Sequence, residues 1–385
     1  MLFIESVLNL SRHILFIALG ISGIGFLIGF HELGHFLFCK LFGIATPSFS
    51  IGMGPKIISK KIGETEFSLS LLPLGGYVEI AGAAEVGQGD QKEAYSVNSD
   101  SFATKPFYQK LLVMLGGIAF NLLFAYIVIT CLFLSKPTST FLFPSNATPT
   151  ISAIAKDSAA EKGGLQAGDT LISIDHTTIA NNIHPFLLAI QNSPEVPTTI
   201  TVKRDQEILQ IPITPDSTTH PNTHKTIGTL GITAFKPIAS CSILEAVKRG
   251  ITQTNMFIVG TGRGLINIIT QKNFSSMTGP IGIIALGSGE AAKGMEYFFF
   301  LLALISISLA IFNLIPLPIF DGGQILFYAI EALIGRPLSP TIREYIHMAT
   351  WLLVLALIVG LSIRDITRIA SPHIETTLQF LGLRK

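Results

Sequence analysis

Four long apolar runs divide the chain, at residues 14–38, 111–134, 297–316 and 345–363. Each run is close to the ~20 mostly apolar residues that a helix needs to cross a bilayer. Their length predicts four transmembrane helices, and an even number of spans places both termini on one side of the membrane. The third run ends in NLIPLPIFDGG, where Pro316 and Pro318 prevent a regular helix and predict an extended backbone within the membrane region.

Two of the segments between the runs have regular patterns of their own. The segment 39–110 contains period-2 stretches broken by glycine, which predicts short strands joined by turns. Within it, SLSLLPLGGY is too apolar for a free loop, so we expect a β element that dips into the membrane face and is covered by protein. At residues 242–270, apolar positions near helical spacing alternate with basic ones, which predicts an amphipathic helix at the membrane interface and not a further span.

The largest polar section, residues 137–293, contains a candidate globular domain at 150–215. A core strand region is followed by a short helix at 184–191 and by a hairpin, TITVKRDQEILQIPI, that alternates around Arg204 and Asp205. Strand, helix and hairpin together predict one small α+β domain. The sequence PDSTTHPNTH that follows is rich in Pro, Thr and Asn, which predicts a linker.

Composition also favours a membrane protein. Hydrophobic residues make up 49% of the chain and charged residues 13%, against ~25% charged in soluble domains. The formal net charge of +1 provides no basic field, so we expect the lipid bilayer and no nucleic acid among the partners. Three widely spaced cysteines provide no disulfide framework. The first apolar run continues past any small-residue cleavage site, so we expect an uncleaved helix and no signal peptide.

Three ionisable side chains lie inside the first apolar run, in HELGH. His31 and His35 are four residues apart, share one helix face and can bind one metal ion, while Glu32 can act as base on a metal-bound water. The alternative is a set of satisfied polar groups at a helix end. Inside a span this alternative is weaker, because each intramembrane charge costs roughly 2.5–3.5 kcal/mol on insertion scales.

Two histidines leave a zinc site short of one protein ligand. Asp321 is the only acid in the motif that ends the third run, and Gly322 and Gly323 after it allow a sharp chain reversal. Taken alone, an aspartate before glycine can be a helix cap or a turn residue. Beside an intramembrane HExxH it is the best candidate for the third ligand of Zn²⁺.

With these motifs the chain resembles the site-2 protease family of intramembrane zinc metalloproteases, specifically the bacterial regulator-of-sigma-E protease branch (peptidase M50-like). Supporting stretches are FSIGMGPKI, LLPLGGYV, GGIAFNLLFA and MTGPIGI. The resemblance implies that His31, His35 and Asp321 are zinc ligands, that Glu32 is the general base, and that Asn313 helps hold the substrate or transition state. It also implies that a β element pairs with unwound substrate through residues that include Leu71, Pro73, Gly75, Gly76 and Tyr77.

The middle section shows one PDZ-like core, SAAEKGGLQAGDTLISID, where well-characterised members of the family carry two PDZ domains. Phe320 and Gln324 also depart from the common pattern around the aspartate. The PDZ-like domain implies recognition of a polypeptide by strand addition, or alternatively a spacer that excludes bulky substrates. In the second span, Gly116 and Gly117 permit close helix approach, and Asn121 has either a structural hydrogen bond to a neighbouring helix or a catalytic role.

We therefore expect a multi-pass α-helical membrane protein of about four transmembrane helices, with a membrane-associated β element and one inserted PDZ-like α+β domain. The expected parts are the first helix with HExxH, the β region, the second helix, the PDZ-like domain, an amphipathic segment, and the third and fourth helices. Their ranges are 1–38, 39–110, 111–136, 150–215, 240–295 and 296–385.

The expected function is that of an intramembrane zinc endopeptidase that cleaves transmembrane segments in regulated intramembrane proteolysis. By resemblance, its substrates are single-span membrane proteins such as anti-sigma factors or signal-peptide remnants. The alternatives are an intramembrane metal or ion transporter, or an inactive scaffold that binds membrane proteins.

Loop charges predict the orientation. Lysines close to the first two spans favour a cytoplasmic first loop, although Arg364 and Arg368 on the other side weaken the signal. This orientation places HExxH near the cytoplasmic side of a bacterial inner membrane and the PDZ-like domain on the periplasmic, extracytoplasmic side. The lysines are Lys40, Lys56, Lys60, Lys61, Lys105 and Lys110.

Overall fold

The computed structural model describes residues 2–83, 98–135, 147–175, 177–179, 183–219, 226–237, 242–271 and 277–380. The chain divides into two compact units, and each is described by itself. The first unit combines Met1–Ile129 with Ile251–Lys385, and the second is Thr130–Gly250. Two long helices connect the units: α2 (Phe107–Leu134) leads into the second unit and α5 (Ile243–Gln271) leads out of it.

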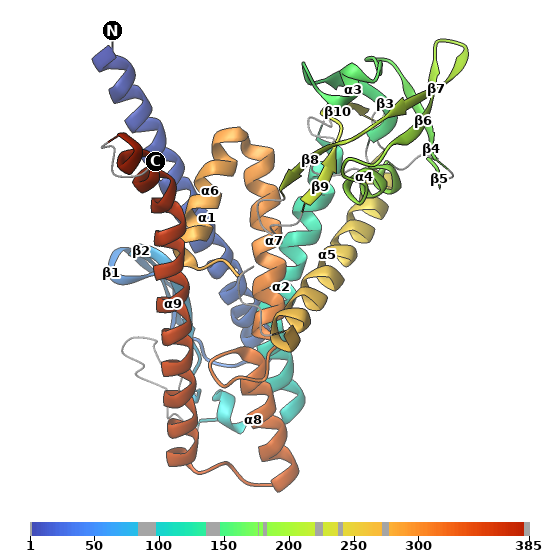
Figure 1. Ribbon diagram of the computed structural model, residues 1–385. Helices are drawn as coiled ribbons and strands as arrows, with labels where there is room; N and C mark the ends of the chain where they lie inside the picture. The colour runs from blue at the N-terminus through green and yellow to red at the C-terminus, as the bar shows by residue number, and fades with distance from the viewer. Residues whose placement is uncertain are drawn as a thin grey trace. The chain divides into compact units, whose positions relative to one another are not determined.

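Four helices of the described chain are long and apolar enough to cross a membrane. They overlap the four predicted runs, and the structure therefore fits a membrane protein. The helices are α1 (Leu2–Leu41), α2, α7 (Met295–Asn313) and α9 (Pro340–Phe380) (Figure 1). Their candidate spans are Ile14–Leu41, Phe107–Leu134, Met295–Asn313 and Thr341–Arg368.

Glycines bring α1 into close contact with its neighbours. A Cβ atom added to Gly34 would fall on the backbone carbonyl of Gly116, so the two helices touch backbone to backbone at the HELGH motif. A Cβ on Gly287 of α6 (Pro280–Lys293) would lie 3.4 Å from the Cα of Gly20. Small residues permit such approaches in membranes, where close packing holds helices together. The face of α1 that carries the histidines therefore lies against α2.

The segment 240–295 forms two helices, α5 and α6. Among the described residues α5 is not a candidate span, in agreement with its mixed pattern. The N-terminus of α6 is held by α9, because the Asp365 carboxylate accepts hydrogen bonds from the backbone N–H of Gly282 at 2.8 Å and of Gly279 at 3.3 Å. The MTGPIGI stretch thus begins a helix that contacts both α1 and α9.

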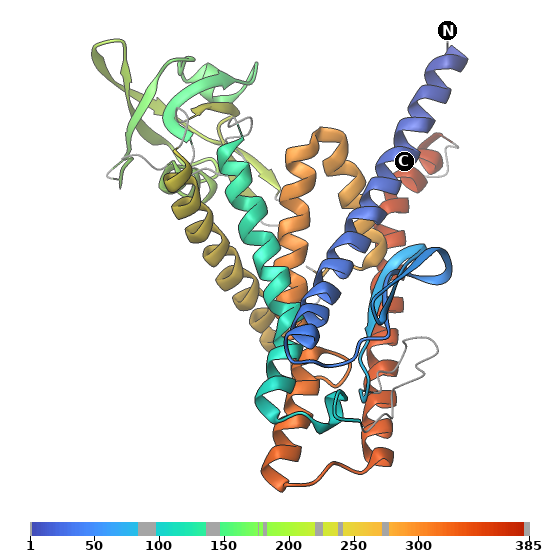
Figure 2. The same cartoon turned by 180° about the vertical axis from the view of Figure 1, so that it is seen from behind.

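The β element consists of β1 (Ser48–Ile62) and β2 (Thr65–Glu79), two long bent strands in place of the predicted short ones. The distal halves form an antiparallel hairpin that closes at the pair Ile62 and Thr65. Nearer the helices, residues 48–51 pair with 76–79 on one side and with 66–69 on the other. The bends use glycine, since Gly52 and Gly75 have φ of 88° and 114°, values that other residues rarely adopt. β2 packs against α1 (Figure 2).

The proline-rich break after α7 is confirmed, but the predicted extended backbone is wrong. Residues 314–320 form turns, and α8 (Asp321–Ile334) begins directly at the aspartate. The predicted chain reversal at Gly322 and Gly323 is also wrong, because both lie in the first turn of α8. A Cβ on either glycine would fall on the carbonyl of Leu314 or Leu317. These glycines therefore provide space for the preceding turn to fold back on the helix.

Among its described residues, the second unit contains a six-stranded sheet, a separate two-stranded sheet and two short helices. The helices are α3 (Ala159–Lys162) and α4 (His184–Gln191), the latter as predicted. The sheet order is β10-β3-β4-β6-β7, with β5 (Thr177–Thr178) paired to β4. Its strands are β3 (Ala147–Ile154), β4 (Thr170–Ile174), β6 (Thr198–Arg204), β7 (Glu207–Ile213) and β10 (Ile232–Pro237). Fully buried side chains between sheet and helices include Ile151, Leu171, Ile174, Phe186, Ile200 and Val202.

This sheet continues beyond residue 215, where the sequence predicts its end, because β10 pairs with β3. The linker predicted after residue 214 is wrong in part. β8 (Asp216–Thr219) pairs with β9 (Thr226–Thr229), and residues 220–225 lie outside the described chain. Threonine-rich composition resembles that of a linker, but β-branched side chains also suit strands.

One ion pair is buried within the second unit. Arg204 donates through Nε to Asp169 Oδ1 at 2.7 Å and through a terminal nitrogen to Oδ2 at 2.8 Å. The Asp169 side chain is fully buried, and the Gln166 N–H also donates to it. Burial alone would raise the pKa of the Asp169 carboxyl, but the hydrogen bonds from Arg204 and Gln166 outweigh burial and lower that pKa below its ordinary value.

Candidate active site

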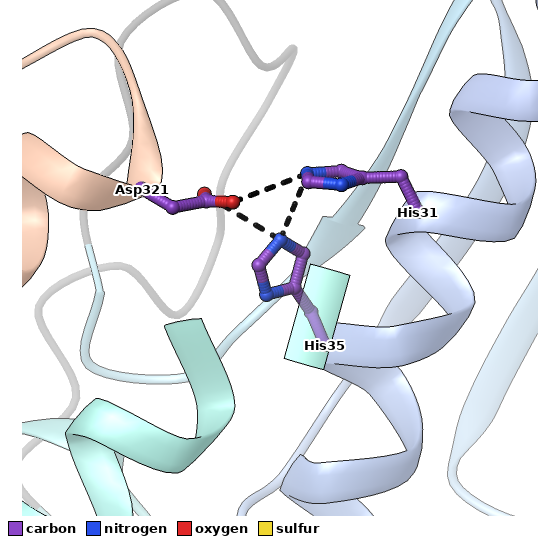
Figure 3. Close-up of side chains that lie close together, drawn as sticks. All are labelled: His31, His35 and Asp321. Carbon is purple, nitrogen blue, oxygen red and sulfur yellow. Dashed lines mark hydrogen bonds and ion pairs between the residues drawn. The ribbon is translucent and has the colours of Figure 1, made fainter. Parts of the chain in front are cut away.

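The structure brings His31, His35 and Asp321 together. Both imidazoles project from the same face of α1 toward Asp321 in the first turn of α8 (Figure 3). The His31 Nε2 and His35 Nε2 atoms are 3.1 Å apart, and they lie 3.4 and 3.5 Å from the two carboxylate oxygens of Asp321. Both histidines are buried. Among the described residues, these three side chains form a group that could hold a metal ion.

The three side chains fit Zn²⁺. Two imidazole nitrogens and one carboxylate oxygen are the ligand set of a catalytic zinc with one open position. Ligand atoms that each lie ~2 Å from one tetrahedral ion are separated by roughly 3.3 Å, and the two imidazole nitrogens are 3.1 Å apart. In addition, Asp321 Oδ2 is buried without a hydrogen-bond partner among the described residues. A buried carboxylate oxygen without a donor is costly, and a cation among these atoms removes that cost.

Helix α2 determines how the two rings present their nitrogens. His35 Nδ1 lies 2.8 Å from the backbone carbonyl of Val113, so Nδ1 carries the proton and donates it. The lone pair of His35 Nε2 then points at the cluster, as a metal ligand requires. On the other ring, His31 Nδ1 lies 3.1 Å from the side-chain amide of Asn121. The sequence predicts that Asn121 has either a structural hydrogen bond to a neighbouring helix or a catalytic role. In the structure its side-chain amide contacts the His31 ring of α1.

Gly117 makes room for both rings. A Cβ atom at this position would fall on His31 Cε1 and would lie 2.5 Å from His35 Nε2. The sequence indicates that Gly116 and Gly117 allow helix approach, and Gly116 has this role against Gly34. Gly117 has a more specific role, because any larger side chain would occupy the space of the imidazoles.

Asn313 lies beside this cluster, and Glu32, the neighbour of His31 in the sequence, lies beside β2. A Cβ added to Gly76 of β2 would be 3.6 Å from Glu32 Cγ. Asn313, the last residue of α7, places Nδ2 3.5 Å from His31 Nε2. Gly76, one of the residues predicted to contact substrate, therefore lies beside Glu32.

The other predicted substrate residues lie on the same strand. Leu71 is exposed, Gly75 forms the bend, and Tyr77 pairs with Ser50. Pro73 lies in β2, but its side chain is outside the described residues.

Sequence reasoning did not find the contacts that hold the aspartate turn. Gln324 Nε2 donates to the Pro318 carbonyl at 2.6 Å and lies 3.2 Å from His347 Nε2 of α9. This amide closes the turn that leads into Asp321 and connects α8 with α9. A histidine inside the fourth apolar run was an available signal, because polar side chains in spans usually have a partner or a function. The contact of the Val113 carbonyl with His35 could not be predicted in this way, because every residue has a backbone carbonyl.

Comparison with known proteins points to the same chemistry. The model of peptidase family M50 matches residues 19–357. A Clostridium perfringens protein with a provisional zinc metalloprotease name is 31% identical over 361 residues, covering 92% of this chain and 98% of that protein. The regulator of sigma-W protease RasP of Bacillus subtilis is 27% identical over 418 residues, covering 90% and 96%. Zinc metalloprotease RasP of Geobacillus kaustophilus is 28% identical over 422 residues, covering 89% and 96%.

Fold, site and relatives together define a membrane-embedded zinc metalloprotease. Its cofactor is Zn²⁺, the metal named in these relatives and suited to the ligand atoms of the site. The chain belongs to peptidase family M50.

Proposed function

We propose that this protein is an intramembrane endopeptidase that cleaves the transmembrane segments of single-span membrane proteins. In this proposal His31, His35 and Asp321 hold Zn²⁺, and Glu32 is the general base. The observation that carries it is the convergence of two histidines on the candidate span of α1 with Asp321 at the start of α8, with ligand atoms all within 4.8 Å of one another. A metalloprotease with its two histidine ligands on a span acts on peptide bonds at membrane depth.

When bound, Zn²⁺ supplies a Lewis acid that polarises the scissile carbonyl and lowers the pKa of water to about 7. Glu32 removes a proton from the attacking water and then delivers it to the leaving amine. The Val113 carbonyl keeps the proton of His35 on Nδ1. The amide of Asn313, beside His31, offers a hydrogen-bond donor where the carbonyl oxygen gains negative charge.

A substrate helix must unwind before attack, because its amides are hydrogen-bonded along the helix and its carbonyls are shielded. The strand segment 76–79 is suited to receive the unwound chain. It pairs with 48–51 in the sheet, and its first residue, Gly76, lies beside Glu32. Strand addition there would replace the lost backbone hydrogen bonds next to the general base. Tyr77 belongs to this segment, and Leu71, Pro73 and Gly75 lie on the same strand before Gly76.

The second unit is, in this proposal, the PDZ-like domain, and it binds a polypeptide. Its support is the edge position of β10 in the sheet and the packing of α4 beside that strand, where the Phe186 and Phe235 rings are 6.4 Å apart. An edge strand next to a helix can accept an added peptide strand. The competing role is a spacer that excludes bulky substrates. Measured binding of trimmed substrate ectodomains to the full-length protein separates the two roles, since a spacer shows none.

The proposed location is the bacterial inner membrane, with HExxH near the cytoplasmic side and the PDZ-like domain in the periplasm or outside the cytoplasm. The supporting features are the bacterial relatives and the lysines near the cytoplasmic ends assigned to the first two spans. Anti-sigma factors are one proposed substrate class, because the name of the Bacillus subtilis relative refers to regulation of a sigma factor. Signal-peptide remnants are the other, since both are single spans.

A cleavage assay tests the proposal against its alternatives. The full-length protein in detergent is mixed with a tagged single-span substrate as wild type, as Glu32→Gln, and after chelation of zinc. We expect cleavage by the wild type alone, with activity restored when Zn²⁺ is added back. Cleavage in all three samples, or in none, contradicts the proposal. Metal flux into liposomes without cleavage indicates the transporter, and substrate capture without cleavage indicates the scaffold.

A further inference from the structure

Asn121 is a buried amide inside a membrane-spanning helix, with 1% of its surface exposed. As placed, its Nδ2 lies 3.1 Å from His31 Nδ1, while its Oδ1 is buried and has no hydrogen-bond partner in the described chain. One end of the amide thus faces the imidazole and the other has no hydrogen-bond partner in the described chain, so the protonation of the ring decides which end faces it.

The two ends of an amide have nearly the same shape and can be exchanged by a half-turn of the side chain. If Nδ2 donates to His31 Nδ1, then Nδ1 is bare and the ring proton must be on Nε2. That tautomer is incompatible with Nε2 as a metal ligand, and Nε2 is the atom that faces His35 and Asp321. With the amide turned, Oδ1 accepts from Nδ1–H, and Nε2 keeps a lone pair for the metal.

Gly117, one helical turn before Asn121, lies on the Nδ1 side of the same ring, because a Cβ there would be 2.7 Å from that atom. Helix α2 therefore borders His31 at Nδ1, and Nε2 is the nitrogen that faces His35 and Asp321.

We propose that Asn121 is a positioning residue that accepts a hydrogen bond from His31 Nδ1 and so fixes the tautomer in which Nε2 binds Zn²⁺. The inference rests on the proposed ligand role of His31. The other ring provides the parallel, since the Val113 carbonyl on the same helix receives Nδ1–H of His35 at 2.8 Å. Helix α2 thus orients both ligands, one through its backbone and one through a side chain. Such contacts also raise the basicity of a ligand.

Helix α7 holds Asn121 in place. Ser306 is fully buried and its hydroxyl donates to the backbone carbonyl of Asn121 at 2.8 Å. The same helix ends at Asn313, whose amide lies beside His31 Nε2. α2 and α7 lie side by side in both views (Figures 1 and 2). The position of the acceptor is therefore set by packing between two spans, which suits a residue that must orient a ring.

The test compares Asn121→Asp with Asn121→Leu in the full-length protein. Asp keeps an acceptor oxygen at the same distance, and Leu has similar size without one. Zinc affinity is measured by competition with a graded chelator, followed by metal analysis of the protein. We expect Asn121→Leu to lose about 10- to 100-fold in zinc affinity, as for other supporting partners of histidine ligands, and Asn121→Asp to stay within a few-fold of wild type.

A matched control removes another polar contact between helices. Asn255 of α5 accepts a hydrogen bond from Tyr126 of α2, away from the ligands. Asn255→Leu is expected to leave zinc affinity unchanged. Cobalt substitution gives a second readout, because the visible spectrum of Co²⁺ reports its ligands and does not depend on turnover. We expect an altered spectrum in Asn121→Leu alone.

The proposal is overturned if Asn121→Leu binds zinc as tightly as wild type, or if Asn121→Asp loses as much affinity as Asn121→Leu. If Asn121→Leu does not survive purification, Asn121→Ala replaces it with the same expected outcomes. His31→Ala separates this inference from the proposed function. Loss of zinc in His31→Ala with normal binding in Asn121→Leu rejects only the role of Asn121, whereas normal binding in His31→Ala rejects the ligand assignment itself.

Discussion

Two aspartates that are largely shielded from solvent, one in each unit, show how surroundings assign different roles to the same side chain. Asp169 in the second unit faces the guanidinium of Arg204 across two hydrogen bonds of 2.7 and 2.8 Å. Asp321 in the first unit faces two imidazoles and, among the described residues, forms no ion pair with Lys or Arg. The charge of Asp169 is balanced by Arg204 within the folded protein. The charge of Asp321, which faces two neutral imidazoles, would be balanced by a bound cation.

A third aspartate, which is buried, extends the comparison. Asp365 of α9 accepts backbone N–H groups at the start of α6, an arrangement typical of a helix cap with partial positive charge. The partners of the three acids are thus a guanidinium, a pair of imidazoles, and backbone amides. Burial of a carboxylate alone therefore does not identify a metal site, whereas the chemistry of its neighbours does.

The largest expected effect follows from replacing Asp321 by Asn. Because the carboxylate completes the ligand set, Asp321→Asn should lose zinc by more than the about 10- to 100-fold typical of a supporting residue, and proteolysis should become undetectable. Zinc content and cleavage of a single-span substrate are the measurements. Glu32→Gln is the matched control, expected to keep zinc and to lose about 10²–10⁴-fold in rate. Normal zinc content in Asp321→Asn would contradict the ligand assignment.

The second expected effect follows from Asp169→Asn, which leaves Arg204 with a neutral partner. Breaking a buried ion pair costs about 3–5 kcal/mol, and we expect the lower end, since the Arg204 side chain is 27% exposed. Hydrogen exchange of β4 and β6 in the full-length protein measures the loss. Zinc content is expected to stay normal. Loss of zinc without faster exchange in these strands would reverse the contrast between the two aspartates.

The pH dependence of the second unit tests the same ion pair without a ligand change. Since the pKa of folded Asp169 is lowered, its contribution to stability is present above the pKa of the unfolded chain and is lost as the pH falls through the folded value. The difference in exchange protection between wild type and Asp169→Asn should therefore shrink on acidification from pH 7. A difference that stays constant down to about pH 2, below the ordinary range of an aspartate, would show that the hydrogen bonds of Asp169 do not depend on its charge.

The smallest expected effect is that of Asp365→Ala, which removes the cap of α6. Loss of a helix cap costs about 0.5–2 kcal/mol. Faster hydrogen exchange at residues 280–284 is the expected measurement, with Asp365→Asn intermediate because its amide oxygen still accepts. Zinc content should remain normal in both variants. Unchanged exchange in Asp365→Ala would mean that packing of α6 against α1 suffices to hold this terminus.

Local sequence patterns were sufficient to predict the candidate spans and the two groups of candidate metal-ligand residues. Run length identified the four candidate spans, because a bilayer demands a fixed number of apolar residues. The spacing of His31 and His35 placed both rings on one face of α1, because a helix has 3.6 residues per turn. Asp321 stood out as a carboxylate after a break in an apolar run. These features need no knowledge of distant contacts.

Tertiary structure alone decided what surrounds those residues. It placed α8 opposite α1, assigned the Val113 carbonyl to His35, and gave Gly117 the space that two imidazoles require. It also showed that Gly322 and Gly323 are helical, and that β10 joins a sheet predicted to end earlier. The physical reason is that every residue has the same backbone carbonyl, so the sequence does not show which carbonyl accepts a hydrogen bond. A glycine leaves space for a neighbour, but the sequence does not show which neighbour occupies that space. Only the packing of distant segments supplies that neighbour.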